Sequence, residues 1–228
     1  MTVYRKIYKL GDFNRREILR YSGVKEPDSS LEKLLYECMK MCGGFSGGVC
    51  FCRVPVKISE EGVDLGFTRV KSSGLAKNLR DCDEARVFAA TVGAEIDRLT
   101  EKYNRIDIAK AVFLQAIGAE RIESLCDKFC RELERDMKNE GLFTRPRFSP
   151  GYGDLPLSVQ GDVIRVCDAA RRLGLTLTDS LLMTPGKSVT ALLGVTPLPV
   201  TENGKKQDKC SRCPNRGRCA FRKRGTIC

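Results

Sequence analysis

The stretch ERIESLCDKFCRELERDM, from Glu120 to Met137, carries the clearest structural pattern in this chain of 228 residues. Its apolar residues recur at steps of three and four, the spacing that places side chains on one face of an α-helix. They are Ile122, Leu125, Cys126, Phe129, Cys130, Leu133 and Met137. We therefore predict one long helix over roughly Ile106–Met137, with this face buried.

Shorter elements are predicted on both sides of this helix. Upstream, the patterns indicate helices near residues 12–22 and 29–42, a hairpin turning at Glu60–Gly62, a helix from Ser72 or Ser73 to Leu79, and a strand over Ala85–Val92. Downstream, they indicate a helix from Val159 to a stop at Gly174, then two short strands, LTLTDSLLM and KSVTALLGV, separated by a turn at Thr184–Gly186. This mixture favours an α+β fold of long helices with a mainly antiparallel sheet, rather than a doubly wound one.

Pro197 and Pro199 mark the expected end of this domain. We assign residues 1–197 to the domain and residues 198–228 to a basic, cysteine-rich tail. From Thr201 onward, nine Lys and Arg residues stand against Glu202 and Asp208, so the tail holds +7 of the net charge of +11. A tail of this kind can bind nucleic acid, an acidic protein or the charge of its own thiolates.

The composition excludes several classes of chemistry. The chain has no histidine, which removes the usual acid/base of neutral pH and any imidazole ligand for a metal. It has no GxGxxG or Walker motif, no apolar run long enough to span a membrane, and no apolar signal core. We therefore expect a cytoplasmic protein whose 12 cysteines are reduced thiols or metal ligands.

Two groups of cysteines are candidate metal sites. In the tail, Cys210, Cys213, Cys219 and Cys228 have the spacing C-x2-C-x5-C-x8-C, which suits an iron–sulfur cluster, a zinc ion, or redox-active or free thiols. The second group is Cys38, Cys42, Cys50 and Cys52. We expect the last two to point to opposite sides of a strand, so buried structural thiols are favoured over a second metal site.

The stretch RPRFSPGYGDLPLS, from Arg145 to Ser158, connects two predicted helices. Its prolines and glycines fix an irregular path, and composition alone favours a rigid interhelical loop. A binding site is the alternative, because Arg147 offers a forked donor for a carboxylate and Tyr152 a face for stacking.

The segment RFSPGYGD resembles the RxxPGYP signature of the activation domain of cobalamin-dependent methionine synthase. Two further blocks are similar to this family in register, SSGLAKNLRDCDEARVFAATVGAEIDRL upstream and GLTLTDSLLMTPGKSVTALLGV downstream. The likeness covers roughly residues 15–196. It implies the fold of that domain, which binds S-adenosylmethionine.

The resemblance implies roles for five residues. Arg147 would bind the methionyl carboxylate, Glu123 would accept from the ammonium or ribose, the backbone at Ser149 and Gly151 would contact the ligand, and Tyr152 would pack beside it. Without the resemblance, Glu123 belongs with Glu120 and Asp127 to an acidic stripe expected on a solvated helix face. The family's N-terminal acidic contact has no counterpart that the sequence identifies, and Gly153 replaces the proline after the tyrosine.

The implied function is reactivation of a methyltransferase, with no catalytic acid or base needed. The chain lacks room for the other methionine synthase modules, so it would act in trans on a corrinoid protein that presents cobalamin. Flavodoxin or ferredoxin, or a tail cluster, would supply the electron. Two alternatives stay open: a nucleic-acid-binding protein with a zinc-knuckle-like tail, which the scarcity of aromatic residues there disfavours, and a docking scaffold that has lost ligand binding.

Overall fold

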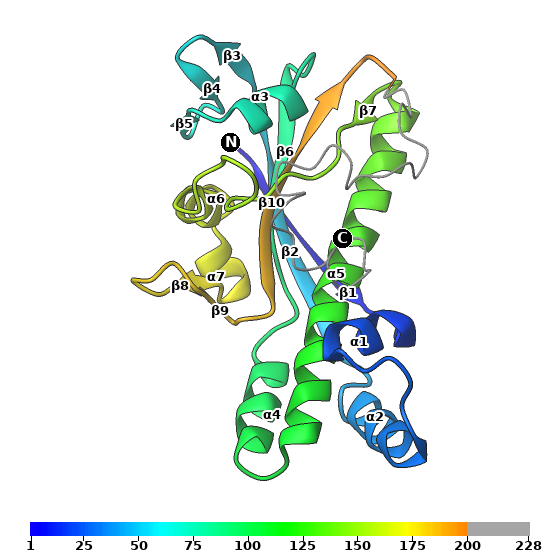
Figure 1. Cartoon of the computed structure of the whole chain (residues 1–228). Coiled ribbons are helices and arrows are strands. Elements are labelled where there is room, and N and C mark those ends of the chain that lie inside the picture. Colours follow the sequence, from blue (N-terminus) through cyan, green and yellow to red (C-terminus); the bar gives the residue numbers. More distant parts are fainter. Residues whose placement is uncertain (200–228) are drawn as a thin grey trace. The chain divides into compact units, whose positions relative to one another are not determined.

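Five strands form the central sheet of the computed structural model, which describes residues 1–199. In sheet order they are β1 (Val3–Lys9), β2 (Ser46–Pro55), β6 (Glu84–Thr91), β10 (Ser188–Thr196) and β7 (Phe143–Thr144). Every neighbouring pair is antiparallel. Figure 1 shows this sheet passing through the middle of the molecule with helices on both sides. The predicted α+β fold with an antiparallel sheet is confirmed.

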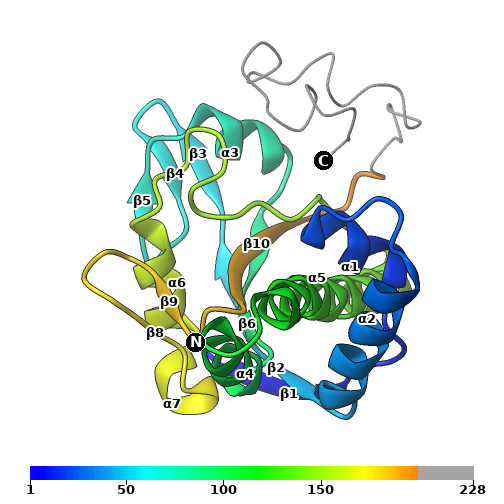
Figure 2. The same cartoon turned by 60° about the horizontal axis from the view of Figure 1, so that its bottom comes forward.

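Four helices cover one face of the sheet, as Figure 2 shows most clearly. They are α1 (Arg15–Ser22), α2 (Ser29–Met41), α4 (Glu95–Asn104) and the long α5 (Ile108–Asn139). The Asp107 side chain caps α5 by accepting from the Lys110 backbone N–H. Phe129 of α5 packs its ring against Phe51 and Phe88, with ring centroids 5.1 and 5.0 Å apart. The apolar face predicted for this helix therefore forms the first core of the protein.

The opposite face of the sheet carries the second core. It is covered by α3 (Ser73–Asn78), α6 (Val159–Val166), α7 (Ala169–Leu173) and a small sheet of β3 (Lys57–Ser59), β4 (Gly62–Asp64) and β5 (Arg69–Val70). Side chains of a strand alternate between its faces, so Val49 enters the first core and Cys50 the second. The α3 helix, with Ser72 as its N-cap, and the hairpin of β3 and β4 confirm the predictions for these segments.

Two predicted elements differ from the structure. The helix expected from Val159 to Gly174 is broken at Asp168, whose φ of 51° is left-handed, a conformation that aspartate tolerates but that interrupts the helical hydrogen bonds. The stretch LTLTDSLLM is not one strand. It folds on itself as the hairpin of β8 (Thr176–Leu177) and β9 (Met183–Thr184), closed by a hydrogen bond of 2.9 Å from Thr178 N to Leu182 O.

The four N-terminal cysteines are all buried. Cys38 and Cys42 belong to the core on the α5 side, whereas Cys50 and Cys52 both lie in the second core. The expectation that the last two point to opposite sides was wrong, because residues two apart on a strand share a face. Burial raises the pKa of Cys38 to about 11 and that of Cys42 to about 12. Within residues 1–199, no three Cys, Asp or Glu side chains are grouped so that they could hold a metal ion.

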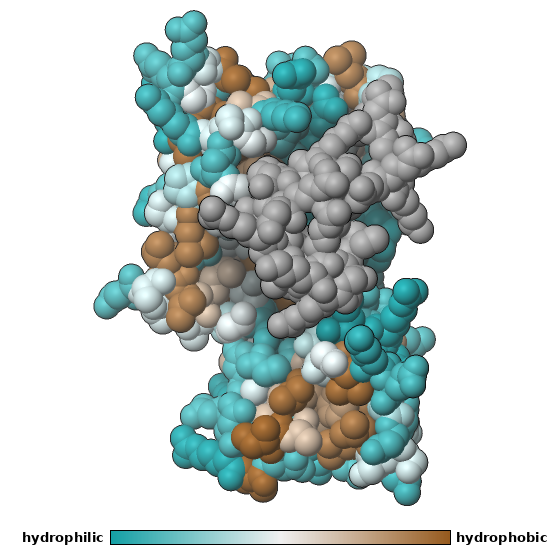
Figure 3. Space-filling view, in the orientation of Figure 1, coloured by the Kyte–Doolittle hydropathy of each residue, from teal (hydrophilic) through white to brown (hydrophobic). Residues whose placement is uncertain are grey.

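Exposed apolar side chains gather where α4 meets α5, at the lower end of the molecule in Figure 3. Ile106, Ile108 and Val112 are 66%, 64% and 43% exposed. Among the described helices, none is long and apolar enough to cross a membrane.

Candidate functional site

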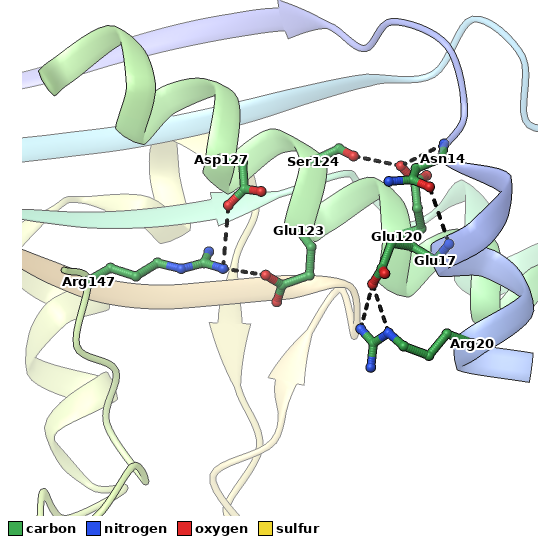
Figure 4. A network of polar contacts seen from close by, with 8 residues as sticks. All are labelled: Asn14, Glu17, Arg20, Glu120, Glu123, Ser124, Asp127 and Arg147. Atoms are coloured by element: carbon green, nitrogen blue, oxygen red, sulfur yellow. Dashed lines mark hydrogen bonds and ion pairs between the residues drawn. The ribbon is translucent and has the colours of Figure 1, made fainter. Parts of the chain in front are cut away.

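A polar cavity of about 350 Å³ lies between α1, the middle of α5 and the segment that follows β7. Figure 4 shows most of its side chains, with α1 on one side and Arg147 on the other. The lining residues are Asn14, Glu17, Arg20, Tyr21, Glu120, Glu123, Ser124, Asp127 and Arg147. Apart from Tyr21, each of them carries a charged group, an amide or an aliphatic hydroxyl. The cavity therefore suits a ligand with both positive and negative groups.

The backbone that leads into residues 149–154, which we call the PGY loop, directs Arg147 toward α5. Arg145 N donates to Gly194 O at 2.8 Å, and Phe148 exchanges two hydrogen bonds with Leu192 at 2.9 and 3.0 Å. This extended segment thus continues along β10. Phe148 is buried in the second core, and the preceding side chain, Arg147, faces the other way because side chains alternate in extended backbone.

Arg147 meets two carboxylates of α5. Its Nη2 donates to Glu123 Oε2 and lies 3.7 Å from Asp127 Oδ1. The Arg147 side chain is 28% exposed, and its Nη1 is buried without an acceptor among the described residues. A guanidinium group has five N–H donors, and a carboxylate can take two at once. Nη1 is therefore a spare donor, but it is closed off from the cavity, so an added carboxylate would reach it only after the Arg147 side chain turns.

The far wall of the cavity belongs to α1. Asn14 caps this helix by accepting from Glu17 N at 3.3 Å. Glu17 pairs with Arg20 at 2.6 and 2.9 Å, and the guanidinium of Arg20 lies 4.2 Å from the centre of the Tyr21 ring. Burial, with the nearby charge of Glu123, raises the pKa of Tyr21 and keeps its hydroxyl protonated. This wall of the polar cavity therefore offers a carboxylate, a cation and a hydroxyl group.

The expectation of a solvated acidic stripe on α5 was wrong for Glu120. It is only 2% exposed and accepts from the Arg121 side chain, from Ser124 Oγ at 2.6 Å and from Asn14 N at 3.3 Å. Asp127 is exposed, as expected, and Glu123 is half-buried. Tertiary contacts with the loop before α1 bury Glu120, and helical spacing alone does not reveal them.

Asp154 fixes the PGY loop against α3. Its carboxylate accepts from Ser72 Oγ at 2.5 Å, from Ser73 N and Oγ at 2.6 and 2.8 Å, and from Gly74 N at 3.1 Å. The hydrogen bonds from Ser72 and Ser73 lower the pKa of Asp154 to about 2. The loop is thus anchored at its end by an ionised carboxylate.

Gly153, where the family signature has proline, has a φ of +60°. Proline is fixed near −65°, so this backbone path excludes it. Gly151, with a φ of +84°, is also left-handed, and its N–H donates to Leu155 O at 2.9 Å. Tyr152, between these glycines, is 66% exposed and packs edge-on against Phe148 at 5.3 Å. Its ring therefore presents an open face to solvent.

The structure brings together two of the predicted site residues, Arg147 and Glu123. Ser149, Gly151 and Tyr152 lie on the adjoining loop and do not line the polar cavity. Sequence reasoning missed the contribution of α1, whose polar residues carry no signal that points to α5. The tail cysteines, Cys210, Cys213, Cys219 and Cys228, lie outside the described residues.

Comparisons with known proteins agree on the fold and the family. The family model described as the activation domain of vitamin B12-dependent methionine synthase matches residues 75–199, more than half of the chain. The crystal structure of the MetH reactivation domain bound to AdoHcy matches with a TM-score of 0.61 at 14% sequence identity, covering 87% of this chain and 80% of that chain. A search of curated proteins found no match. The chain therefore belongs to the family of vitamin B12-dependent methionine synthase activation domains.

Proposed function

We propose that this protein binds S-adenosylmethionine and supports the reductive methylation of cob(II)alamin on a separate corrinoid protein, such as methionine synthase. The observation that carries the proposal is the pairing of Arg147 with Glu123 at a polar cavity, beside the PGY loop. The similar MetH reactivation domain was crystallised with AdoHcy, the demethylated product of this ligand, which supports the same ligand class here.

The polar cavity fits the amino-acid end of S-adenosylmethionine. Its volume of about 350 Å³ is at the lower end for small-molecule sites, and the lining is charged. The ligand's carboxylate would bind Arg147, whose side chain is 28% exposed at the cavity, and its ammonium would bind Glu123. Binding then exchanges one ion pair within the protein for two between protein and ligand. Glu17, on the facing wall, is our candidate for the N-terminal acidic contact that the sequence did not identify.

The PGY loop would hold the nucleoside end outside the cavity. The absent side chain at Gly153 leaves room for the close approach of a ligand, whereas the same space at Gly151 is filled by the Leu157 side chain. Tyr152 offers its exposed ring to the ligand, and the backbone of Ser149 and Gly151 offers amides and carbonyls. Because Asp154 anchors this loop to α3, the contacts would be positioned before the ligand arrives.

The protein's part in the reaction would be orientation. When bound, the ligand would supply a sulfonium methyl group to the partner's cobalamin, once one electron has reduced that cofactor. It would leave as S-adenosylhomocysteine. Arg147 and Glu123 would hold the amino-acid end still, so that the methyl group faces the partner. No proton has to be moved, in keeping with a chain that has no histidine. A flavodoxin or ferredoxin is our proposed source of the electron.

Calorimetric titration of the protein with S-adenosylmethionine tests this proposal. We expect saturable heat with S-adenosylmethionine and with S-adenosylhomocysteine, since both carry the amino-acid end. Methylthioadenosine lacks that end and is expected to bind at least about tenfold more weakly, because it cannot form the charge-assisted contacts. Absence of heat with all three compounds would contradict the proposed function, and equal affinity for all three would contradict the assignment of the polar cavity.

A Glu123→Gln variant is expected to change the preference for the ligand's amino group. It removes the partner of the ammonium, so the affinity for S-adenosylhomocysteine should fall by roughly tenfold. It also releases Arg147 from its ion pair, so an analogue that lacks the α-amino group should bind as well as before or more tightly. Calorimetry with both compounds measures the change, and Glu134→Gln, on the exposed part of the same helix, is the matched control. Equal losses for both compounds would show that Glu123 does not contact the amino group.

A further inference from the structure

The Glu120–Arg121 pair is an unusual feature of α5. Neighbouring residues of a helix point in different directions and do not normally face each other. Here Arg121 Nε and Nη2 nevertheless donate to the two carboxylate oxygens of Glu120, at 2.6 and 2.7 Å. The side chains are 2% and 3% exposed. A buried ion pair is costly unless further hydrogen bonds satisfy it, so its other partners indicate what holds it there.

Those partners all belong to the loop between β1 and α1, apart from Ser124. Arg121 Nη1 donates to Gly11 O at 2.7 Å and Nη2 to Asp12 O at 2.9 Å, and the guanidinium lies 4.2 Å from the centre of the Phe13 ring. Glu120 in turn accepts from Asn14 N at 3.3 Å. The pair therefore binds four consecutive residues, 11–14, to the middle of α5.

This loop determines where α1 begins. Asn14 is both the N-cap of α1 and the residue whose backbone Glu120 holds (Figure 4). The helix has only eight residues, too few to be stable alone, so its position depends on its contacts. Its buried Ile18 and Leu19 supply some of them, but these apolar contacts do not fix the start of the helix. The pair on α5 is bonded to the residue at that start, Asn14.

We infer that the Glu120–Arg121 pair is a positioning device for the binding site: it holds α1 so that Glu17, Arg20 and Tyr21 face Glu123 and Arg147 across the polar cavity. Arg121 itself does not line that cavity. The inference rests on the proposed function for its effect on ligand binding. The positioning of α1 is separate from that function and can be measured without ligand.

The Arg121→Lys variant tests the inference with charge retained. A lysine ammonium keeps the pairing with Glu120 but cannot reproduce the guanidinium's fork to both Gly11 O and Asp12 O. We expect the backbone amides of α1 to exchange hydrogen at least about tenfold faster in the ligand-free variant. The affinity for S-adenosylmethionine should fall by roughly tenfold, while thermal unfolding stays cooperative. Lys128→Gln is the matched control, because Lys128 also ties α5 to the N-terminal segment, by a 2.9 Å hydrogen bond to Lys9 O outside the cavity.

A double-mutant cycle separates positioning from general destabilisation. If Arg121 acts through α1, Glu17→Gln should weaken binding in the wild type but have little further effect in Arg121→Lys. In the Lys128→Gln background, Glu17→Gln should keep its full effect. Unchanged exchange of the α1 amides in Arg121→Lys would overturn the inference, whatever the ligand result. If the wild type does not bind S-adenosylmethionine at all, the proposed function fails, and the exchange measurement still decides the positioning of α1.

Discussion

Replacing Arg147 with glutamine is expected to weaken the binding of S-adenosylmethionine by roughly thirtyfold or more, about 2 kcal/mol. The variant loses the cation that would bind the ligand's carboxylate. It also leaves Glu123 and Asp127 without their shared partner, so their negative charge opposes the approach of the carboxylate. Calorimetry of the wild type and the variant under the same salt conditions measures the effect.

The shape of the guanidinium group can be tested separately from its charge. Arg147→Lys keeps the positive charge but not the planar fork, so its affinity should lie between those of the wild type and Arg147→Gln. Arg145→Gln is the matched control, because Arg145 lies two residues earlier and contacts Arg80 O at 3.0 Å, away from the cavity. Equal affinity of Arg147→Gln and the wild type would refute the role assigned to Arg147.

Little loss of stability is expected in these Arg147 variants. The side chains of Glu123 and Asp127 are 41% and 55% exposed, so water can solvate both carboxylates when Arg147 is absent. Ion pairs this accessible contribute at most about 1 kcal/mol to folding. A fall in affinity with an almost unchanged melting temperature would therefore locate the effect in the binding site.

The sequence predicts the elements of this fold better than their contacts. The apolar spacing of α5 identifies the helix because one face is buried along its whole length. The break at Asp168 escapes prediction, since the helical pattern continues across it and only the left-handed backbone reveals it. The strand β1 was also missed, because its alternation is weak: of its seven residues only Tyr8 is buried.

The candidate site was predictable only in part, for a related reason. Arg147 and Glu123 are 24 residues apart and were linked through the resemblance to the family. At the wall formed by α1, the contact between Asn14 and Glu120 spans 106 residues of sequence, and the family match begins only at residue 75. Glu17 and Arg20 look like an ordinary ion pair on a helix surface until the fold places them opposite Glu123. Their role depends on the tertiary position of α1, which local patterns do not contain.

A substitution on the buried face of α5 should lower the free energy of unfolding more than a substitution of any residue of the site. Phe129→Ala removes a ring that is 2% exposed and that packs against both Phe51 of β2 and Phe88 of β6. Deleting a buried aromatic side chain typically costs about 3–5 kcal/mol, because the cavity that it leaves is only partly refilled. For a domain of this size, the melting temperature should fall by roughly 10 °C. Thermal and urea unfolding followed by circular dichroism measure the change.

The same variant shows whether folding and binding can be separated on one helix. Phe129 enters the sheet core, whereas Glu123 and Asp127 lie on the part of α5 that faces Arg147. Below its melting temperature, Phe129→Ala should therefore retain affinity for S-adenosylmethionine within about threefold of the wild type. Arg147→Gln should instead lose affinity while its melting temperature stays almost unchanged. Arg131→Ala, at an exposed position two residues along, should change stability by no more than about 0.5 kcal/mol. If Phe129→Ala is as stable as Arg131→Ala, α5 does not hold the sheet as the aromatic contacts indicate.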